Sequence, residues 1–298
     1  MTYSIVARDE STGELGVGVQ TCFLAVGSIA PWARPGVGAV ATQAFAELAY
    51  GQRCLDALGA GRPATDALAE ARAADPMAEL RQVGVVASSG DVAAMTGELC
   101  VDHAGHVIGD GFTTQANMVG SPEVWGGMAA AYESSTGALA RRLLAALEAG
   151  EAAGGDARGR MSAALLVVEG SPPDQPGGGT VVDLRIDRSE DPIGELARLL
   201  DAADAFADYD RATDQLFAGD AAAALGSIDR ALEALPGEEN FRLIRAGALL
   251  ASGATDEGLA ELRALVADRP TWEIIVRGFE RRGLVTLPEG ISIDAVLA

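Results

Sequence analysis

Hydrophobic and polar side chains alternate at the start of the chain with the period of two that is typical of a half-buried β-strand. In residues 2–8 the positions that begin with Thr2 share one face, and those that begin with Tyr3 share the other. Turn residues separate this strand from a second one at 15–22, and a glycine-interrupted apolar strand follows at 36–43. Three strands in succession predict an antiparallel sheet.

After these strands, helical and strand patterns come in blocks. Helical periodicity marks 47–59, 63–74, 123–131 and 137–150, and strand patterns mark 82–87, 92–96, 113–118, 162–168 and 180–186. We expect a loop around residues 31–35 and a turn-like segment at 103–106. Segregated blocks of strands and helices predict an α+β fold, in which helices sandwich antiparallel sheets.

The last hundred residues carry an internal repeat. Gly219 recurs as Gly253 and Pro236 as Pro270, a spacing of 34 residues that is the tetratricopeptide period. Two repeats fall below the three usually needed for stability, so we expect a helix near 271–282 to cap them. The array is either a peptide-binding groove or a packing and dimerisation module, and so short an array favours the second.

Length and composition bound the class of protein. The 298 residues suit two domains, which we place at 1–200 and 201–298. No long apolar stretch and no signal-like start are present, and Cys22, Cys54 and Cys100 form no Cys-x-x-Cys pair. The formal charge of −21 argues against nucleic acid or anionic membrane as partners. We therefore expect a soluble, cytoplasmic protein.

The identity of the cationic residues is more informative than their number. All 22 are arginine, so a Walker-A lysine, a Schiff-base lysine and a Ser-Lys dyad are excluded. No glycine-rich dinucleotide fingerprint and no Gly-x-Ser-x-Gly elbow occur in the required context. His103 and His106 lack a third metal ligand nearby. We expect neither a cofactor nor a metal.

The Met1-Thr2 dipeptide offers a nucleophile that needs no histidine. Methionine aminopeptidases remove Met1 before a small residue, which would leave Thr2 with a hydroxyl and a free amine. An α-amino group titrates at roughly pH 7.7–8.0, so it can accept the hydroxyl proton near neutrality. The plainer interpretation is an ordinary strand after an initiator methionine.

Three short polar segments, at 42–43, 115–117 and 154–162, lie within or beside strands that otherwise consist of small or apolar residues. They contain the candidate residues Thr42, Gln43, Asn117, Asp156, Arg158 and Ser162. Neutral amides can donate to an oxyanion, but a buried amide can equally serve as a satisfied core group. A Cys-His nucleophile that uses Cys22 or Cys54 remains an alternative, although no local signature supports it.

Taken together, these segments closely resemble the DUF1028 family, over roughly residues 1–200. The motifs that carry the resemblance are 1–9 (MTYSIVARD), 12–17 (TGELGV), 25–28 (AVGS), 36–43 (GVGAVATQ), 50–51 (YG) and 154–165 (GGDARGRMSAAL). That family is assigned to the N-terminal nucleophile hydrolase superfamily. The resemblance implies a four-layer αββα sandwich and amide hydrolysis by a processed N-terminal residue. The tetratricopeptide-like tail lies outside it.

Carried onto this chain, the resemblance makes Thr2 the nucleophile and base of a small-molecule amidohydrolase. Thr42, Gln43 and Asn117 would position the substrate or stabilise the oxyanion. Asp156 and Arg158 would orient the amine or bind a substrate carboxylate, and Ser162 is carried over as a motif position. Proteasome-type members use a lysine that this chain lacks. The alternative is a non-catalytic ligand-binding or scaffold protein, and in either case we expect a homodimer.

Overall fold

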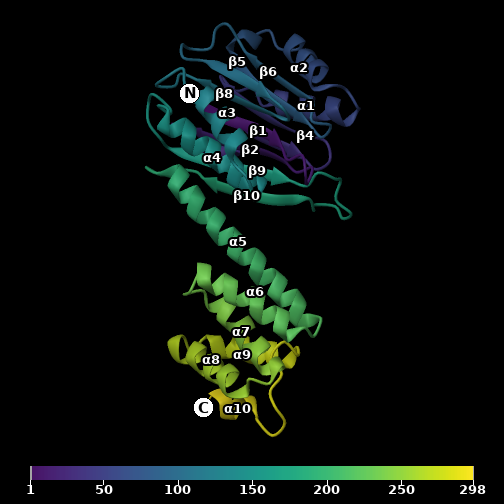
Figure 1. The fold of residues 1–298 in the computed structure, drawn as a ribbon, viewed down its shortest axis with the longest axis vertical. Helices are drawn as coiled ribbons and strands as arrows, with labels where there is room; N and C mark the ends of the chain where they lie inside the picture. The colour runs from purple at the N-terminus through teal and green to yellow at the C-terminus, as the bar shows by residue number, and fades with distance from the viewer. Residues whose placement is uncertain (1, 298) are drawn as a thin grey trace. The chain divides into compact units, whose positions relative to one another are not determined.

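The computed structural model describes residues 2–297 and divides the chain into two compact units, Met1–Leu200 and Asp201–Ala298 (Figure 1). The first unit contains both β-sheets, and the second contains helices. The prediction for Met1, that it is removed, lies outside the described residues.

The larger sheet is antiparallel and places the start of the chain at its centre. Its strands run in the order β10-β9-β2-β1-β8-β7. Their bounds are β1 Thr2–Arg8, β2 Leu15–Thr21, β7 Gly105–Gly109, β8 Phe112–Asn117, β9 Ser162–Val168 and β10 Thr180–Ile186. Because β1 pairs with both β2 and β8, Thr2 begins a central strand and lies in register with Asn117.

The smaller sheet is also antiparallel, with the order β3-β4-β5-β6. Its strands are β3 Pro31–Arg34, β4 Gly38–Ala44, β5 Arg81–Ala87 and β6 Val92–Thr96. Short 3₁₀ turns at Val26–Ser28 and Ala78–Leu80 precede β3 and β5.

The two sheets pack face to face, and helices cover their outer faces (Figure 1). Val6 and Val17 of the larger sheet meet Ala41 of the smaller one in a shared apolar cluster. Tyr3 points the other way, into the core under the helices, so the alternation predicted for residues 2–8 is confirmed. Those helices are α3 Val124–Ser134 and α4 Leu139–Ala152 on the larger sheet, and α1 Ala49–Gly59 and α2 Ala64–Ala73 on the smaller.

Two strands contradict the sequence-based expectation. The segment predicted as a loop forms β3, and the segment predicted as turn-like contains the start of β7. Both are edge strands, which pair on one side only and tolerate residues such as Pro31 at their ends. β3 has only four residues and begins with proline, and β7 has two glycines among its five residues, so neither shows a clear strand pattern.

The second unit consists of helical hairpins. Its helices are α5 Pro192–Phe217, which begins in the first unit, α6 Ala221–Ala234, α7 Glu239–Ser252, α8 Thr255–Asp268, α9 Trp272–Arg281 and α10 Ile293–Leu297. Helices α6 and α8 are both 14 residues long and start 34 positions apart, at Ala221 and Thr255. Asp220 caps α6 by accepting from the backbone N–H of Ala223 at 3.0 Å.

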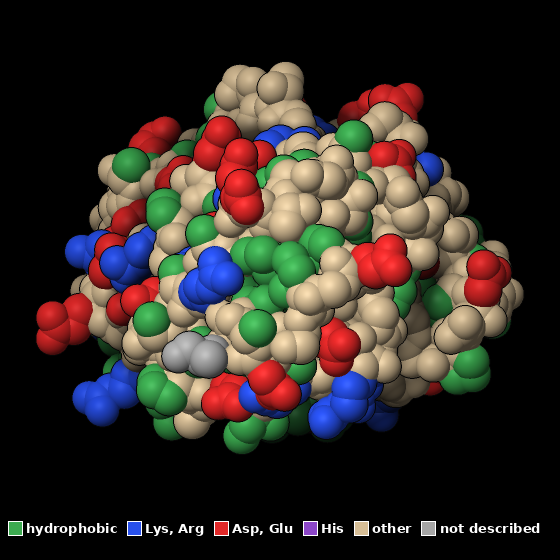
Figure 2. Space-filling model, turned by 90° about the horizontal axis from the view of Figure 1, so that it is seen from below, with side chains coloured by type: hydrophobic (Ala, Val, Ile, Leu, Met, Phe, Trp, Pro, Cys, Tyr) green, Lys and Arg blue, Asp and Glu red, His purple; other side chains and the backbone are tan. Residues whose placement is uncertain are grey.

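Charges of both signs mingle on the face that carries these C-terminal helices (Figure 2). Arg242 pairs with Glu261 at 2.8 Å, and Arg245 pairs with Asp229 at 2.8 Å. Pairs that remain partly exposed in this way contribute about 0–1 kcal/mol each. Among residues 2–297, no helix combines the length and the apolar character needed to cross a membrane.

Candidate functional site

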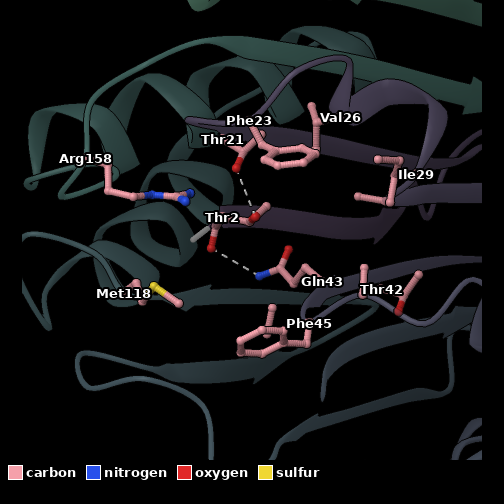
Figure 3. A pocket seen from close by; sticks show the side chains of 13 residues that line it. Thr2, Thr21, Phe23, Val26, Ile29, Thr42, Gln43, Phe45, Met118 and Arg158 are labelled. Carbon is pink, nitrogen blue, oxygen red and sulfur yellow. Dashed lines mark hydrogen bonds between the residues drawn. The ribbon is translucent and has the colours of Figure 1, made fainter. Parts of the chain in front are cut away.

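Thr2 lines a cavity of about 450 Å³ at the end of the central strand (Figure 3). Apolar side chains make up much of the wall. Among the described residues that line the cavity, Arg158 has the only charged side chain. The full lining is Thr2, Thr21, Phe23, Val26, Ile29, Ala30, Thr42, Gln43, Ala44, Phe45, Ala46, Met118 and Arg158.

The contacts of Thr2 fix both its hydroxyl and its carbonyl (Figure 3). The hydroxyl donates to the Thr21 hydroxyl at 3.2 Å, from the neighbouring strand β2. The backbone carbonyl accepts from the Gln43 amide at 3.3 Å and from the Asn117 amide at 3.4 Å. Thr2 is 7% exposed, so its side chain is held between the sheets while it still borders the cavity.

Gln82 connects the two amides that hold Thr2. Its Oε1 accepts from Gln43 Nε2 at 2.7 Å and from Asn117 Nδ2 at 2.9 Å. Its own Nε2 donates to the Ala116 carbonyl at 2.8 Å and to the Thr96 hydroxyl at 2.9 Å. The amide N–H groups of Gln43 and Asn117 are thus donated to protein acceptors, which suits a positioning role.

A second branch ties the same region to β1. Ser4 donates to Gln43 Oε1 at 2.6 Å, and Gln115 Nε2 donates to Ser4 at 2.6 Å. Sequence reasoning missed Thr21, Ser4 and Gln82 as site residues, and it noted Gln115 only as part of the polar segment 115–117, without a role of its own. Ser4 shares a strand face with Thr2, and Gln115 shares one with Asn117, so the period of two was the signal that could have assigned Ser4 and Gln115 to the site.

Asn117 has one polar atom that stands out. Its Oδ1 is buried and has no hydrogen-bond partner among the described residues, although its Nδ2 has two. An unsatisfied buried acceptor costs about 1–3 kcal/mol. The Asn117 side chain lies beside Thr2, because its Nδ2 donates to the Thr2 carbonyl at 3.4 Å.

Asp156 organises the segment that brings Arg158 to the cavity. Its carboxylate is fully buried and accepts from the backbone N–H of Cys22 at 2.8 Å and from that of Arg158 at 2.9 Å. It also pairs with the Arg158 guanidinium at 3.3 Å. In Figure 3 the guanidinium is directed toward Thr2.

Thr42 and Ser162 have different places. Thr42 lines the cavity, and its hydroxyl donates to the Glu47 carbonyl at 3.1 Å. Ser162 lies behind the wall, where it donates to the Phe23 carbonyl at 2.5 Å and accepts from Val26 N–H at 3.1 Å. The structure therefore brings Thr2, Thr42, Gln43 and Arg158 to the cavity, and places Asn117, Asp156 and Ser162 in its supports.

The histidines, Cys54 and Cys100 fall outside this group, whereas Cys22 follows Thr21 and donates its backbone N–H to Asp156. His106 Nδ1 lies 2.9 Å from the Thr96 hydroxyl, and burial lowers the pKa of His106. His103 Nδ1 instead lies 3.0 Å from the Val119 carbonyl. Burial raises the pKa of the Cys54 thiol to about 12, so it is a poor nucleophile. In residues 2–297, no group of three or more ligand-type side chains is arranged to hold a metal.

Comparison with known proteins places the first unit in a family. The profile of DUF1028, described as a family of unknown function, matches residues 2–196. No curated protein matches the chain. The crystal structure of protein SPO2555 from Silicibacter pomeroyi, assigned to DUF1028, is similar with a TM-score of 0.62 and 35% identity, over 68% of this chain and 85% of that chain. The chain therefore belongs to the DUF1028 family.

Proposed function

We propose that the protein hydrolyses a C–N amide bond in a small molecule, with Thr2 as an N-terminal nucleophile. One observation carries this proposal: the Thr2 hydroxyl borders a cavity, while hydrogen bonds to the Thr2 carbonyl fix the start of β1. We further infer that the two packed sheets and their outer helices form the αββα sandwich of the N-terminal nucleophile hydrolases.

In the proposed reaction, Thr2 Oγ1 attacks the amide carbonyl carbon, and the Thr2 amine takes the hydroxyl proton. The amine then gives that proton to the leaving nitrogen as the C–N bond breaks, which leaves an ester between the acyl group and Thr2. Water then attacks this ester while the amine takes a proton from it, the bond between the acyl carbon and Thr2 Oγ1 breaks, and the amine returns the proton to Oγ1. The products are a carboxylic acid and an amine, and Thr2 is regenerated.

A guanidinium–carboxylate pair lies near Thr2. The Arg158 guanidinium is directed toward Thr2 (Figure 3) and pairs with the Asp156 carboxylate at 3.3 Å, so in the proposed reaction it would orient the amine and the substrate. Arginine does not relay protons, so its role would be electrostatic. The unpartnered Oδ1 of Asn117 is an acceptor to which the new amine could donate.

We infer that the second unit is a tetratricopeptide-like extension that serves packing or dimerisation. The matched lengths and the 34-residue offset of α6 and α8 support a repeat. Two repeats and a following helix are short for a peptide-binding array. A homodimer in solution is the corresponding expectation.

Substitution of Thr2 tests the proposed reaction. Thr2→Ala should abolish hydrolysis across a panel of small amides, whereas Thr2→Ser should retain part of it, because serine keeps the hydroxyl. Alanine and serine are both small, so Met1 removal should be the same in both variants. Full activity in Thr2→Ala would end the mechanism. No hydrolysis of any amide by the unmodified protein would favour the non-catalytic binding role.

A further inference from the structure

The cavity beside Thr2 has two chemically different ends. In Figure 3, Arg158 lies to one side of Thr2, and Phe23, Val26 and Ile29 lie to the other, while Phe45 lies below Thr2 and Gln43. Thr2 therefore stands between a cationic end and an apolar end. A ligand that fits this cavity with its reacting group at Thr2 would have an anionic group on one side of the reacting group and a hydrocarbon group on the other.

At the cationic end, the position of Arg158 is fixed by a buried carboxylate. The Asp156 carboxylate is fully buried. It accepts from the backbone N–H of Arg158 at 2.9 Å and pairs with the Arg158 guanidinium at 3.3 Å. A guanidinium has five N–H donors in a fixed fork, so pairing with Asp156 is compatible with a second carboxylate. The Arg158 side chain is 43% exposed, so ligand can reach it. The chain has a net charge of −21, which repels anions in general, so an anionic substrate would need a local positive charge such as the Arg158 guanidinium in order to bind.

The apolar end is open to ligand. Phe23 and Phe45 are 59% and 55% exposed although they line the cavity, so their rings have area left to cover. They come from different elements, because Phe23 follows β2 and Phe45 follows β4. Ser162 holds the first of these segments through the Phe23 carbonyl at 2.5 Å. Aromatic rings of this kind contribute large apolar contact area with little loss of conformational freedom.

On this basis, and resting on the proposed amide hydrolysis, we propose that the substrates are N-acylated α-amino acids with an apolar acyl group. Their carboxylate lies next to the amide nitrogen and pairs with Arg158. Their acyl chain extends toward Phe23 and Phe45, and the scissile carbonyl lies at Thr2. The cavity of about 450 Å³ falls in the size range of small-molecule sites.

Binding to the unreactive Thr2→Ala variant tests this substrate class without requiring turnover. The probes are N-octanoylglycine, its neutral analogue N-octanoylglycinamide, and N-acetylglycine, each titrated by calorimetry. We expect the acid to bind roughly 10- to 100-fold more tightly than the neutral amide, because a charge-assisted pair with Arg158 is lost in the latter. Equal binding of the acid and the neutral amide would overturn the proposal, as would no binding of the acid.

Substitutions of arginine locate the preference. In the Thr2→Ala background, Arg158→Gln should remove the discrimination between acid and neutral amide, and Arg158→Lys should restore part of it. Arg185→Gln is the matched control, because Arg185 is also 43% exposed and also pairs with an aspartate two residues away, outside the cavity. Discrimination that survives Arg158→Gln, in a variant with unchanged circular dichroism, would contradict the assignment.

The apolar end is tested with the acyl length. Phe23→Ala should reduce the preference for the octanoyl over the acetyl ligand by roughly fivefold or more. The control is Phe217→Ala, which removes a ring of comparable exposure from a helix of the second unit.

Measurements of turnover then separate the proposed ligand class from the proposed reaction. Binding with this discrimination but without hydrolysis refutes the proposed reaction and leaves the ligand class standing, whereas Thr2-dependent hydrolysis of neutral amides without discrimination refutes only the ligand class.

Discussion

The Thr2 hydroxyl lies 3.2 Å from the Thr21 hydroxyl, so the first residue of β1 and the last residue of β2 meet through their side chains at the cavity. This contact orients the Thr2 oxygen, whereas the amides of Gln43 and Asn117 orient its backbone. Both the hydroxyl and the backbone of Thr2, the nucleophile of the proposed reaction, are thus positioned by hydrogen bonds in the absence of substrate.

Loss of the Thr21 hydroxyl should lower activity more than stability. Thr21→Val keeps the shape of the side chain but removes the partner of Thr2, and we expect kcat/KM to fall by about tenfold, the value of one hydrogen bond. Thr114→Val is the control, because its buried hydroxyl bonds to the Trp125 carbonyl on the helix side of the sheet. Equal loss of activity in both variants would show that the Thr2 contact has no special role.

Gln82 should be among the most sensitive polar positions of the first unit. Gln82→Met leaves the Gln43 and Asn117 amides without their shared acceptor, so we expect the free energy of unfolding to fall by about 2–3 kcal/mol. Urea denaturation measures this change. Gln52→Met is the comparison, because among residues 2–297 the exposed Gln52 side chain bonds only to Asp56, and its loss should lower the free energy of unfolding by less than about 0.5 kcal/mol. Similar values for both would refute the network.

Several strands could be predicted to the residue. The bounds of β9 and β10 agree with the predicted 162–168 and 180–186, because each contains several leucine or β-branched residues and is followed by a polar, turn-like segment. The edge strands β3 and β7 could not be found in this way. Both are short and contain proline or glycine, so their local pattern resembles a loop, whereas β10, which is also an edge strand, is longer and richer in β-branched residues.

Gly84 should not tolerate a side chain, because it lies where the two sheets approach. A Cβ at this position would be 2.4 Å from Gln115 Oε1 and 2.8 Å from Thr113 Cγ2. We expect Gly84→Ala to destabilise the protein by about 1–3 kcal/mol, through displacement of the side chain that holds Ser4.

Gly126→Ala provides the matched control for that substitution. Gly126 lies in α3, and a Cβ there meets no atom within 4 Å. Alanine should stabilise this helix by up to about 1 kcal/mol. Thermal unfolding of both variants should therefore show opposite shifts, and a shift of the same sign and size would contradict the close approach at Gly84.

The pH dependence of stability should carry a contribution from His106. Burial lowers the pKa of this histidine below its ordinary 6.5, so the unfolded chain binds the proton more strongly. The contribution is fully present above pH 6.5 and is lost as the pH falls through the window between 6.5 and the lower folded pKa. The pH slope of the unfolding free energy over this window should be smaller in His106→Gln than in the unmodified protein. Parallel slopes would argue against the burial effect.

The candidate site was predictable only where the chemistry is local. Thr2 carries both a hydroxyl and, once Met1 is lost, an amine, so one dipeptide sufficed to single it out. Its partners depend on register between strands: Thr21 is 19 positions away and Gln43 is 41 positions away. Gln82 was missed because it reaches Asn117 across the interface of two sheets, a relationship that no spacing in the sequence encodes.

The most direct test of the central claim is the intact mass of the protein, expressed with its native N-terminus and without a tag at that end. The proposed reaction uses the Thr2 amine as the base, and an amide nitrogen cannot take that role. The predicted result is the mass of a chain that begins at Thr2. A preparation that hydrolyses its amide substrate while Met1 remains on every chain would contradict the claim.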